Sequence, residues 1–193
     1  MPSHVEHLAR TTRSIRRFRN NYPVTEKLML EWVNNARLTA SAKNLQPLKY
    51  RVVTDRETCA KVYETCAWAG YLTDWDGPIE KERPTGYIIM CNDTTLQENT
   101  KATHFDAGIA AQTIMLGATE EGFGGCIIMS FKKKTLIESL EIPEHLDPVF
   151  ILALGRPAED VRIVDIENGD YKYYRDENQV HYVPKRTMEE ILF

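Results

Sequence analysis

The sequence lacks the features that place a chain in a membrane, outside the cell or on a nucleic acid. Its longest apolar runs, such as 149–154, have about six residues, whereas a bilayer-spanning helix needs roughly 18–20. The first residues contain no apolar stretch, so we expect no secretory signal and a cytoplasmic location. The net charge is -4, and this lack of excess basic residues argues against nucleic acid or an anionic membrane as a partner.

Cysteine, glycine and proline are also scarce. The four cysteines, Cys59, Cys66, Cys91 and Cys126, form no CxxC pair, so we expect reduced, buried thiols and no metal site. The sequence contains no GxSxG, HExxH or Walker-type phosphate loop. With 10 glycines, 9 prolines and 42% hydrophobic residues in 193, the composition is globular, and the length favours a single domain over residues 1–193.

Capping residues and hydrophobic spacing predict alternating helices and strands. Ser3, Thr25 and Asp55 are expected to begin helices that end near residues 11, 38 and 71. Further helices are expected at 101–121, 135–140 and 187–192, and strands at 50–54, 86–91, 124–129 and 149–154. This order predicts an α+β or α/β sandwich around one central sheet.

Two segments are expected to make contacts beyond their own element. The helix 101–121 carries a stripe with Phe105 and Ile109, and a face of small residues at Ala107, Ala110 and Ala111 that allows close packing, including across a two-fold axis. The polar, tyrosine-rich residues after 157 have too little apolar surface to fold alone. They are expected to lie on the body of the protein or on a partner subunit.

Three short segments have side chains suited to ligand binding. Residues 10–19, RTTRSIRRFR, hold five arginines with interleaved hydroxyls, which suits a phosphate; the alternative is a solvated basic surface. Residues 40–47, ASAKNLQP, offer amide groups for a heterocycle edge, or form an ordinary polar loop. Residues 122–126, GFGGC, let a planar ligand approach the backbone, or form a helix C-cap followed by a bulge.

These segments occur together in an order typical of one family. Residues 13–18, RSIRRF, and 41–47, SAKNLQP, are followed by 106–112, DAGIAAQ, then by 122–125, 154–157 and 183–186. The ordered set resembles the nitroreductase family of FMN-dependent oxidoreductases along almost the whole chain. The sequence departs from the family at Leu48, where tryptophan is usual, and at Ala40, where proline is frequent. These two changes bear on the shape of the substrate pocket.

The resemblance implies an α+β three-layer sandwich, with a mainly antiparallel central sheet flanked by helices. It further implies a homodimer with two shared FMN sites, in which the C-terminal segment extends onto the partner. The implied ligands of the FMN phosphate and ribityl chain are Arg13, Ser14, Lys185 and Arg186, and Arg16 is implied at the N1/C2=O edge. The ring system would be contacted by Ser41 and Ala42 of the other subunit and by Asn44 and Gln46. The backbone through Gly125, Ile128 and Met129 would run along the N5/O4 side.

The implied activity is two-electron transfer from NADH or NADPH to a nitroaromatic, quinone or similar small molecule by a ping-pong route, with the flavin rather than a protein side chain carrying the hydride. Two alternatives stay open: a dehalogenase or flavin-fragmenting enzyme of the same fold, and a non-enzymatic flavin sensor or phosphate-binding module. The aromatic residues between 68 and 76 are expected to form either a wall or lid over the flavin or part of the core.

Overall fold

The computed structural model describes residues 3–193. Its elements in chain order are α1 (His4–Thr11), α2 (Glu26–Arg37), the 3-10 helix η1 (Ala42–Asn44), β1 (Leu48–Val53), α3 (Arg56–Tyr63), the 3-10 helix η2 (Glu80–Glu82), β2 (Gly86–Asp93), α4 (Lys101–Glu120), β3 (Gly124–Ile128), α5 (Lys133–Leu140), β4 (Leu146–Gly155), β5 (Val161–Asp165), β6 (Tyr174–Arg175), β7 (His181–Lys185) and α6 (Met188–Ile191).

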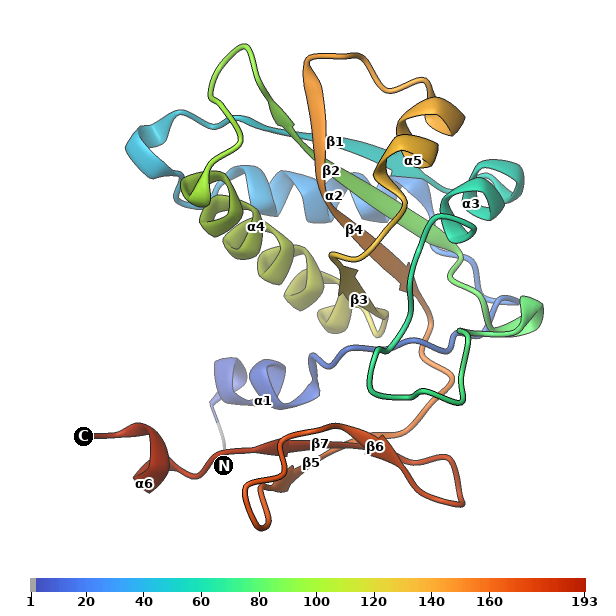
Figure 1. Ribbon diagram of the computed structural model, residues 1–193, viewed down its shortest axis with the longest axis vertical. Coiled ribbons are helices and arrows are strands. Elements are labelled where there is room, and N and C mark those ends of the chain that lie inside the picture. Colours follow the sequence, from blue (N-terminus) through green and yellow to red (C-terminus); the bar gives the residue numbers. More distant parts are fainter. Residues whose placement is uncertain (1–2) are drawn as a thin grey trace.

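A four-stranded antiparallel sheet in the order β1-β2-β4-β3 forms the centre of the molecule (Figure 1). One face packs against α2 and α4 through residues such as Trp32, Ile114 and Leu152. The other face packs against α3 and α5 through residues such as Val62 and Leu136. Every residue of β2 is buried, as expected for a strand covered on both faces. The predicted three-layer α+β sandwich is therefore confirmed.

Local capping begins the first three helices where the sequence predicts. The hydroxyl of Ser3 accepts a hydrogen bond from the Glu6 amide at 3.1 Å, and Thr25 accepts one from Leu28 at 3.3 Å. The carboxylate of Asp55 accepts one from Thr58 at 2.8 Å. Each bond satisfies a backbone N–H that has no partner within its own helix.

The end of α3 differs from the prediction: the helix stops at Tyr63 rather than near residue 71. Beyond it the chain pairs with the segment after β3. The Ala67 amide donates to Ser130 at 2.9 Å, and the Lys132 amide donates to Thr65 at 2.8 Å. These bonds between distant segments replace the continuation of the helix, and they are invisible to a periodicity argument.

The face of α4 that is open to a partner is not the small-residue face that the sequence suggested. The small residues Ala107, Ala110 and Ala111 are at most 1% exposed and pack inside the chain in the cluster that contains α2. They are therefore not a surface for a two-fold contact. The open face instead carries Phe105 and Ile109, which are 70% and 44% exposed. Their spacing along the helix predicted this stripe correctly, and the expected close approach of another element to the small residues is confirmed for α2.

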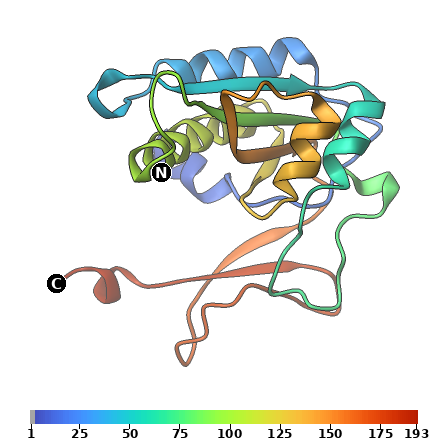
Figure 2. The same ribbon diagram turned by 45° about the horizontal axis from the view of Figure 1, so that its top comes forward.

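The C-terminal residues form a second sheet that the sequence did not predict. Its order is β5-β7-β6, with β5 and β7 parallel. Figures 1 and 2 show it apart from the central sheet, on the side where α1 lies. Most of its side chains are exposed or half-buried, which agrees with the weak hydrophobic pattern. Its contacts with the rest of the chain are with the arginine segment and with residues 68–76. Its extension onto a partner stays a prediction.

The cysteines are all unpaired, as expected. Cys59, Cys91 and Cys126 are buried and Cys66 is partly buried. Burial raises the pKa of each of these thiols to about 12, so none is a reactive thiolate near neutral pH.

Within residues 3–193, no helix is both long enough and apolar enough to cross a membrane.

Candidate flavin site

The N-terminal arginine segment lies along the outer strand of the central sheet. Ser14 forms a parallel β-bridge with Gly125, and the Ile15 amide donates to the Gly125 carbonyl at 2.8 Å. This pairing places Arg13, Ser14 and Arg16 beside the glycine-rich start of β3. Two segments that lie more than a hundred positions apart in the sequence therefore meet at one sheet edge.

Packing accounts for the glycines at this edge. A Cβ atom on Gly125 would lie 2.1 Å from the carbonyl oxygen of Ala153, so β3 and β4 require glycine there. Gly122 has a positive φ of 72° after the last turn of α4, which is the expected helix stop. The C-cap interpretation is therefore confirmed for Gly122. The approach of a planar ligand to this backbone stays a prediction.

Arg13 is a half-buried cation without a counter-ion. Its Nη2 donates to the Ala9 carbonyl at 2.6 Å, but its Nε is buried and makes no hydrogen bond. Among residues 3–193, no carboxylate lies within ion-pair distance of its guanidinium. Burial lowers the pKa of Arg13, because the charged form has lost hydration without gaining an anion. An anionic group such as a phosphate supplies what this side chain lacks.

A buried ion pair fixes the backbone of the same segment. The carboxylate of Glu159 accepts hydrogen bonds from the backbone amides of Arg16 and Arg17. It also pairs with Arg175 at 2.8 Å, and the two side chains are 2% and 7% exposed. Burial, offset by Glu159, lowers the pKa of Arg175. Sequence reasoning missed both residues, because their partners lie far away in the chain.

Arg16 faces the C-terminal sheet. Its guanidinium carbon lies 4.9 Å from the ring centre of Tyr173, and the Tyr173 ring lies 5.3 Å from that of His181. His181 is 1% exposed, and neither ring nitrogen has a hydrogen-bond partner. Burial first, and then the charges of Arg16, Arg175 and Arg17, lower the pKa of His181 to about 4. The ring is thus neutral near pH 7.

The aromatic segment 68–76 joins this contact. Tyr71 packs on Tyr173 with ring centres 5.0 Å apart, and the Arg175 guanidinium lies 4.3 Å from the ring centre of Trp75. Tyr71 is 48% exposed, so this part of the segment is not core. Trp68, which packs on Tyr63 at 5.7 Å, is attached to the second core cluster. A role for the exposed part as a wall or lid over a ligand stays a prediction.

The loop from Ser41 to Gln46 is fixed by a carboxylate on α4. The Ser41 hydroxyl donates to Asp106 at 2.6 Å, and the Ala42 amide donates to the same carboxylate at 2.9 Å. The side chains of Asn44 and Gln46 are exposed. Within this loop, these two amides are the predicted side chains that present exposed polar groups, since the proton of Ser41 is donated to Asp106.

The structure places the predicted site residues in separate groups. The loop 41–46 precedes β1 near the beginning of α4, whereas the arginine segment follows α1 near its end (Figure 1). Among residues 3–193, no hydrogen bond or ion pair joins the loop to Arg13, Ser14 or Arg16. A second subunit that supplies the loop would explain this separation. Lys185 and Arg186 lie at the end of β7, where Arg186 pairs with Glu190 at 3.3 Å.

The end of β3 contributes backbone rather than a polar side chain. Ile128 is 5% exposed in the core facing α3 and α5, whereas Met129 is 67% exposed. A planar ligand along this edge would therefore contact main-chain atoms and the Met129 side chain. The contact of this backbone with the N5/O4 side of a flavin stays a prediction.

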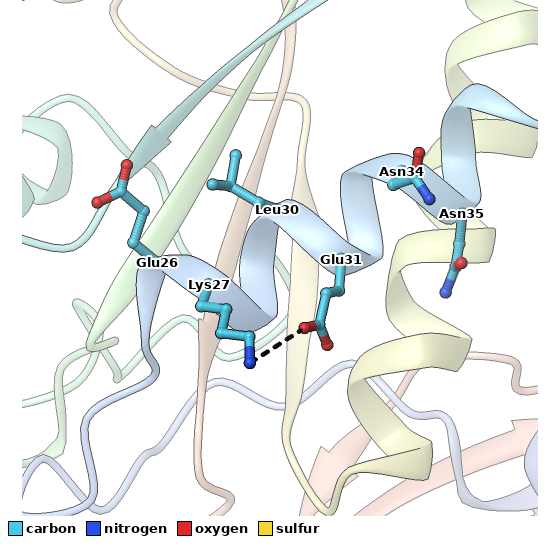
Figure 3. A pocket seen from close by; sticks show the side chains of 6 residues that line it. All are labelled: Glu26, Lys27, Leu30, Glu31, Asn34 and Asn35. Carbon is cyan, nitrogen blue, oxygen red and sulfur yellow. Dashed lines mark ion pairs between the residues drawn. The ribbon is translucent and has the colours of Figure 1, made fainter.

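Two of the hollows on the surface lie away from the predicted site residues, and a third adjoins the loop 41–46. One runs along the outer side of α2, where Lys27 and Glu31 form an ion pair at 4.0 Å; its lining residues are Glu26, Lys27, Leu30, Glu31, Asn34 and Asn35 (Figure 3). A cavity of about 360 Å³ between α3 and η2 contains Tyr63 and Arg83. A smaller one of about 160 Å³ adjoins Ser41, Gln46 and Asp106.

Within the described chain, no group of three or more His, Cys, Asp or Glu residues is placed to hold a metal ion.

Comparison with known families identifies the family of this chain. Residues 9–76 and 81–156 match the sequence profile of the Nitroreductase family. The chain belongs to the nitroreductase family. This membership makes the protein an oxidoreductase, and it covers the arginine segment, the loop 41–46, α4 and the glycine-rich strand in one match.

Individual nitroreductase relatives agree with this assignment. A provisionally named NADH dehydrogenase/NAD(P)H nitroreductase of Methanothermobacter thermautotrophicus is 29% identical over 165 residues, covering 83% of this chain and 81% of the relative. Among solved structures, a nitroreductase family protein of Streptococcus pneumoniae TIGR4 has a TM-score of 0.68 and 20% identity over 97% of this chain and 98% of its own. An FMN-dependent nitroreductase of Clostridium difficile R20291 has a TM-score of 0.65 and 23% identity, over 89% and 98%. The likeness to the solved structures supports the fold.

Proposed function

We propose that this nitroreductase family member is an FMN-dependent enzyme that transfers two electrons from NADH or NADPH to a nitroaromatic, quinone or similar acceptor. The observation that carries the proposal is Arg13, a half-buried guanidinium with an unpaired Nε and no counter-ion, beside Ser14 and the β3 edge. A terminal phosphate matches this cation and hydroxyl. The named FMN dependence of one structural neighbour supports the choice of flavin.

The residues of the chain have distinct parts in this proposal. Arg13 and Ser14 bind the phosphate, with Lys185 and Arg186 as the other basic pair. Arg16 lies at the N1/C2=O edge, where a fixed cation stabilises the negative charge of the reduced ring. The backbone from Gly125 to Met129 lines the N5/O4 side. When bound, FMN itself supplies the hydride chemistry, and the protein binds and orients it.

The working unit is proposed to be a homodimer. The loop with Ser41, Ala42, Asn44 and Gln46 lies apart from the arginine segment of its own chain, so a second copy is needed to bring both to one flavin. The exposed apolar side chains Phe105 and Ile109 on α4 offer a surface for that contact. Two equivalent flavin sites follow from the two-fold symmetry.

Electron donor and acceptor are expected to use one open face of the flavin in turn, giving ping-pong kinetics. The test is anaerobic mixing of the purified, FMN-loaded protein with NADH or NADPH alone. The visible absorbance of the flavin should bleach before an acceptor is present, and a nitroaromatic or quinone should then restore it.

Three results would contradict the proposal. A colourless protein that takes up no FMN at micromolar concentration would exclude a flavoprotein. A flavin bleached by dithionite but by neither nicotinamide would favour a sensor or a flavin enzyme of different chemistry. Loss of the flavin absorbance that no acceptor restores would favour a flavin-fragmenting enzyme.

A further inference from the structure

We infer that Asp106 is a positioning residue that holds the loop Ser41–Gln46 in the conformation that contacts the flavin. The inference rests on the proposed function for the flavin itself. It assigns a role to a carboxylate on α4 that is not itself a predicted flavin ligand but that contacts two of them, Ser41 and Ala42. Asp106 is 4% exposed, so its oxygens face the loop and not solvent.

The first step of the argument is the pattern of hydrogen bonds. Both oxygens of Asp106 are engaged by the loop: Oδ2 accepts from the Ser41 hydroxyl at 2.6 Å, and Oδ1 accepts from the Ala42 amide at 2.9 Å. The Ser41 hydroxyl in turn accepts from the Gln46 amide at 3.0 Å. One buried carboxylate thereby ties the beginning of the loop to its end through a single serine.

The second step is the backbone of the loop. Lys43, Asn44 and Gln46 have φ values of 52°, 56° and 51°. Residues with a Cβ adopt this left-handed region uncommonly, and such residues gather where the surrounding structure imposes a functional geometry. Three of them within four positions require external support, and the bonds to Asp106 supply it.

The third step is the direction in which the side chains point. Ser41 and Ala42 are partly buried against α4, whereas Asn44 and Gln46 are exposed. The Gln46 Nε2 donates to the Asn44 Oδ1 at 3.2 Å, so the two amides are held next to each other. The loop thus turns its polar groups outward while its beginning stays attached to Asp106.

The surroundings of Asp106 also include Tyr50 on β1. Burial and then the negative charge of Asp106 raise the pKa of Tyr50 to about 12. Tyr50 and Asp106 both line the small cavity beside the loop. An amide at position 106 would have only one oxygen, so it could not accept from the Ser41 hydroxyl and the Ala42 amide through separate oxygens, as the carboxylate does.

The experiment compares Asp106→Asn, Ser41→Ala and the double variant, with Asp55→Asn as the matched control. Asp55 also accepts a backbone amide, from Thr58 at 2.8 Å, but it begins α3 far from the loop. Amide exchange of Ala42 and Gln46 in the flavin-free protein reports the loop directly. Fluorescence titration with FMN reports its consequence, and urea denaturation shows whether each variant is folded.

We expect Asp106→Asn to speed exchange at Ala42 and Gln46 and to weaken FMN binding by about tenfold, with Asp55→Asn unchanged in both. Ser41→Ala should weaken binding similarly, and the double variant should add little, because both changes remove one link. Ser41→Thr, which restores the hydroxyl at an extended backbone position with φ of -133°, should recover the affinity.

Two results overturn the inference while the proposed function stands: unchanged loop exchange in Asp106→Asn, or faster exchange with unchanged FMN affinity. If the unaltered protein takes up no FMN, the proposed function fails and the inference falls with it. Failure of the unaltered protein and failure of the variant are therefore distinguishable.

Discussion

At the scale of single residues, some side chains of the arginine segment are free to bind an anion, whereas others are held in place by buried partners. Arg13 has no anionic partner, whereas Arg175 is paired with Glu159, which also fixes the amides of Arg16 and Arg17. A buried cation without a partner lowers the stability of the protein that contains it. Such a cost is typical of a binding site that is complete only with its ligand.

Replacing Arg13 should weaken FMN binding without lowering the stability of the flavin-free protein. We expect Arg13→Met to weaken FMN binding about 10- to 100-fold, since a charge-assisted hydrogen bond contributes roughly 1.5–3 kcal/mol. The flavin-free protein should keep or gain stability, with Tm rising by up to about 2–4 °C for roughly 1 kcal/mol. Thermal denaturation and fluorescence titration measure the two effects.

Arg10→Met is the control for this prediction. Arg10 is exposed and pairs with Glu6 at 3.0 Å, so its replacement should change both quantities little. Equal FMN affinity of Arg13→Met and the unaltered protein would show that Arg13 does not bind the phosphate.

At the scale of elements, the second sheet is attached to the body around one neutral histidine. His181 on β7 packs beside Tyr173, near the charges of Arg16, Arg17 and Arg175. The glutamate and arginine of the buried ion pair also come from this C-terminal part of the chain. Protonation of the ring would place a further positive charge in a buried, cationic surrounding.

Stability should therefore depend on pH through His181. Its pKa in the folded chain is about 4 against an ordinary value of 6.5, so between these values the unfolded chain binds more protons than the folded one. The free energy of unfolding should fall as the pH drops through this window, by about 2 kcal/mol between pH 7.5 and pH 5. Urea denaturation at the two pH values measures the difference.

Two variants identify the source of that pH dependence. His181→Phe keeps an aromatic ring and should reduce the dependence, whereas His145→Gln, at an exposed position, should leave it as it is. An equal pH dependence in the His181→Phe protein would place the titrating group elsewhere.

At the scale of the whole molecule, the separation of the loop 41–46 from the arginine segment makes assembly the central question. The apolar side chains that α4 leaves exposed, Phe105 and Ile109, lie one turn apart along the helix and form a stripe. The second sheet, which lies apart from the central sheet in Figure 2, offers additional surface to a second copy.

Breaking the α4 surface should break both the dimer and the flavin site. We expect Phe105→Glu to sediment as a monomer and to lose most of its FMN, because a charge in an apolar contact is unfavourable and the partner's loop is no longer present. Leu30→Glu is the matched control: Leu30 is 51% exposed on the outer side of α2 (Figure 3), and its replacement should leave the dimer intact. A flavin-loaded dimer of Phe105→Glu would exclude this face as the interface.

The sequence by itself determined the elements whose signals are local. Caps at Ser3, Thr25 and Asp55 depend on residues three positions away, and the buried strands and the glycine stop at Gly122 depend on composition within a few residues. The ordered motifs also identified the family before any contact was known. These features need no knowledge of distant parts of the chain.

Only the tertiary structure decided the features that depend on distant partners. The early end of α3, the inward direction of Ala107, Ala110 and Ala111, and the strands β5 to β7 all follow from pairing or packing with segments far along the chain. The same holds for Asp106 beneath the loop and Glu159 beneath the arginines. Their carboxylates sit in unremarkable sequence surroundings, and their roles arise because folding removes them from water beside backbone amides that need an acceptor.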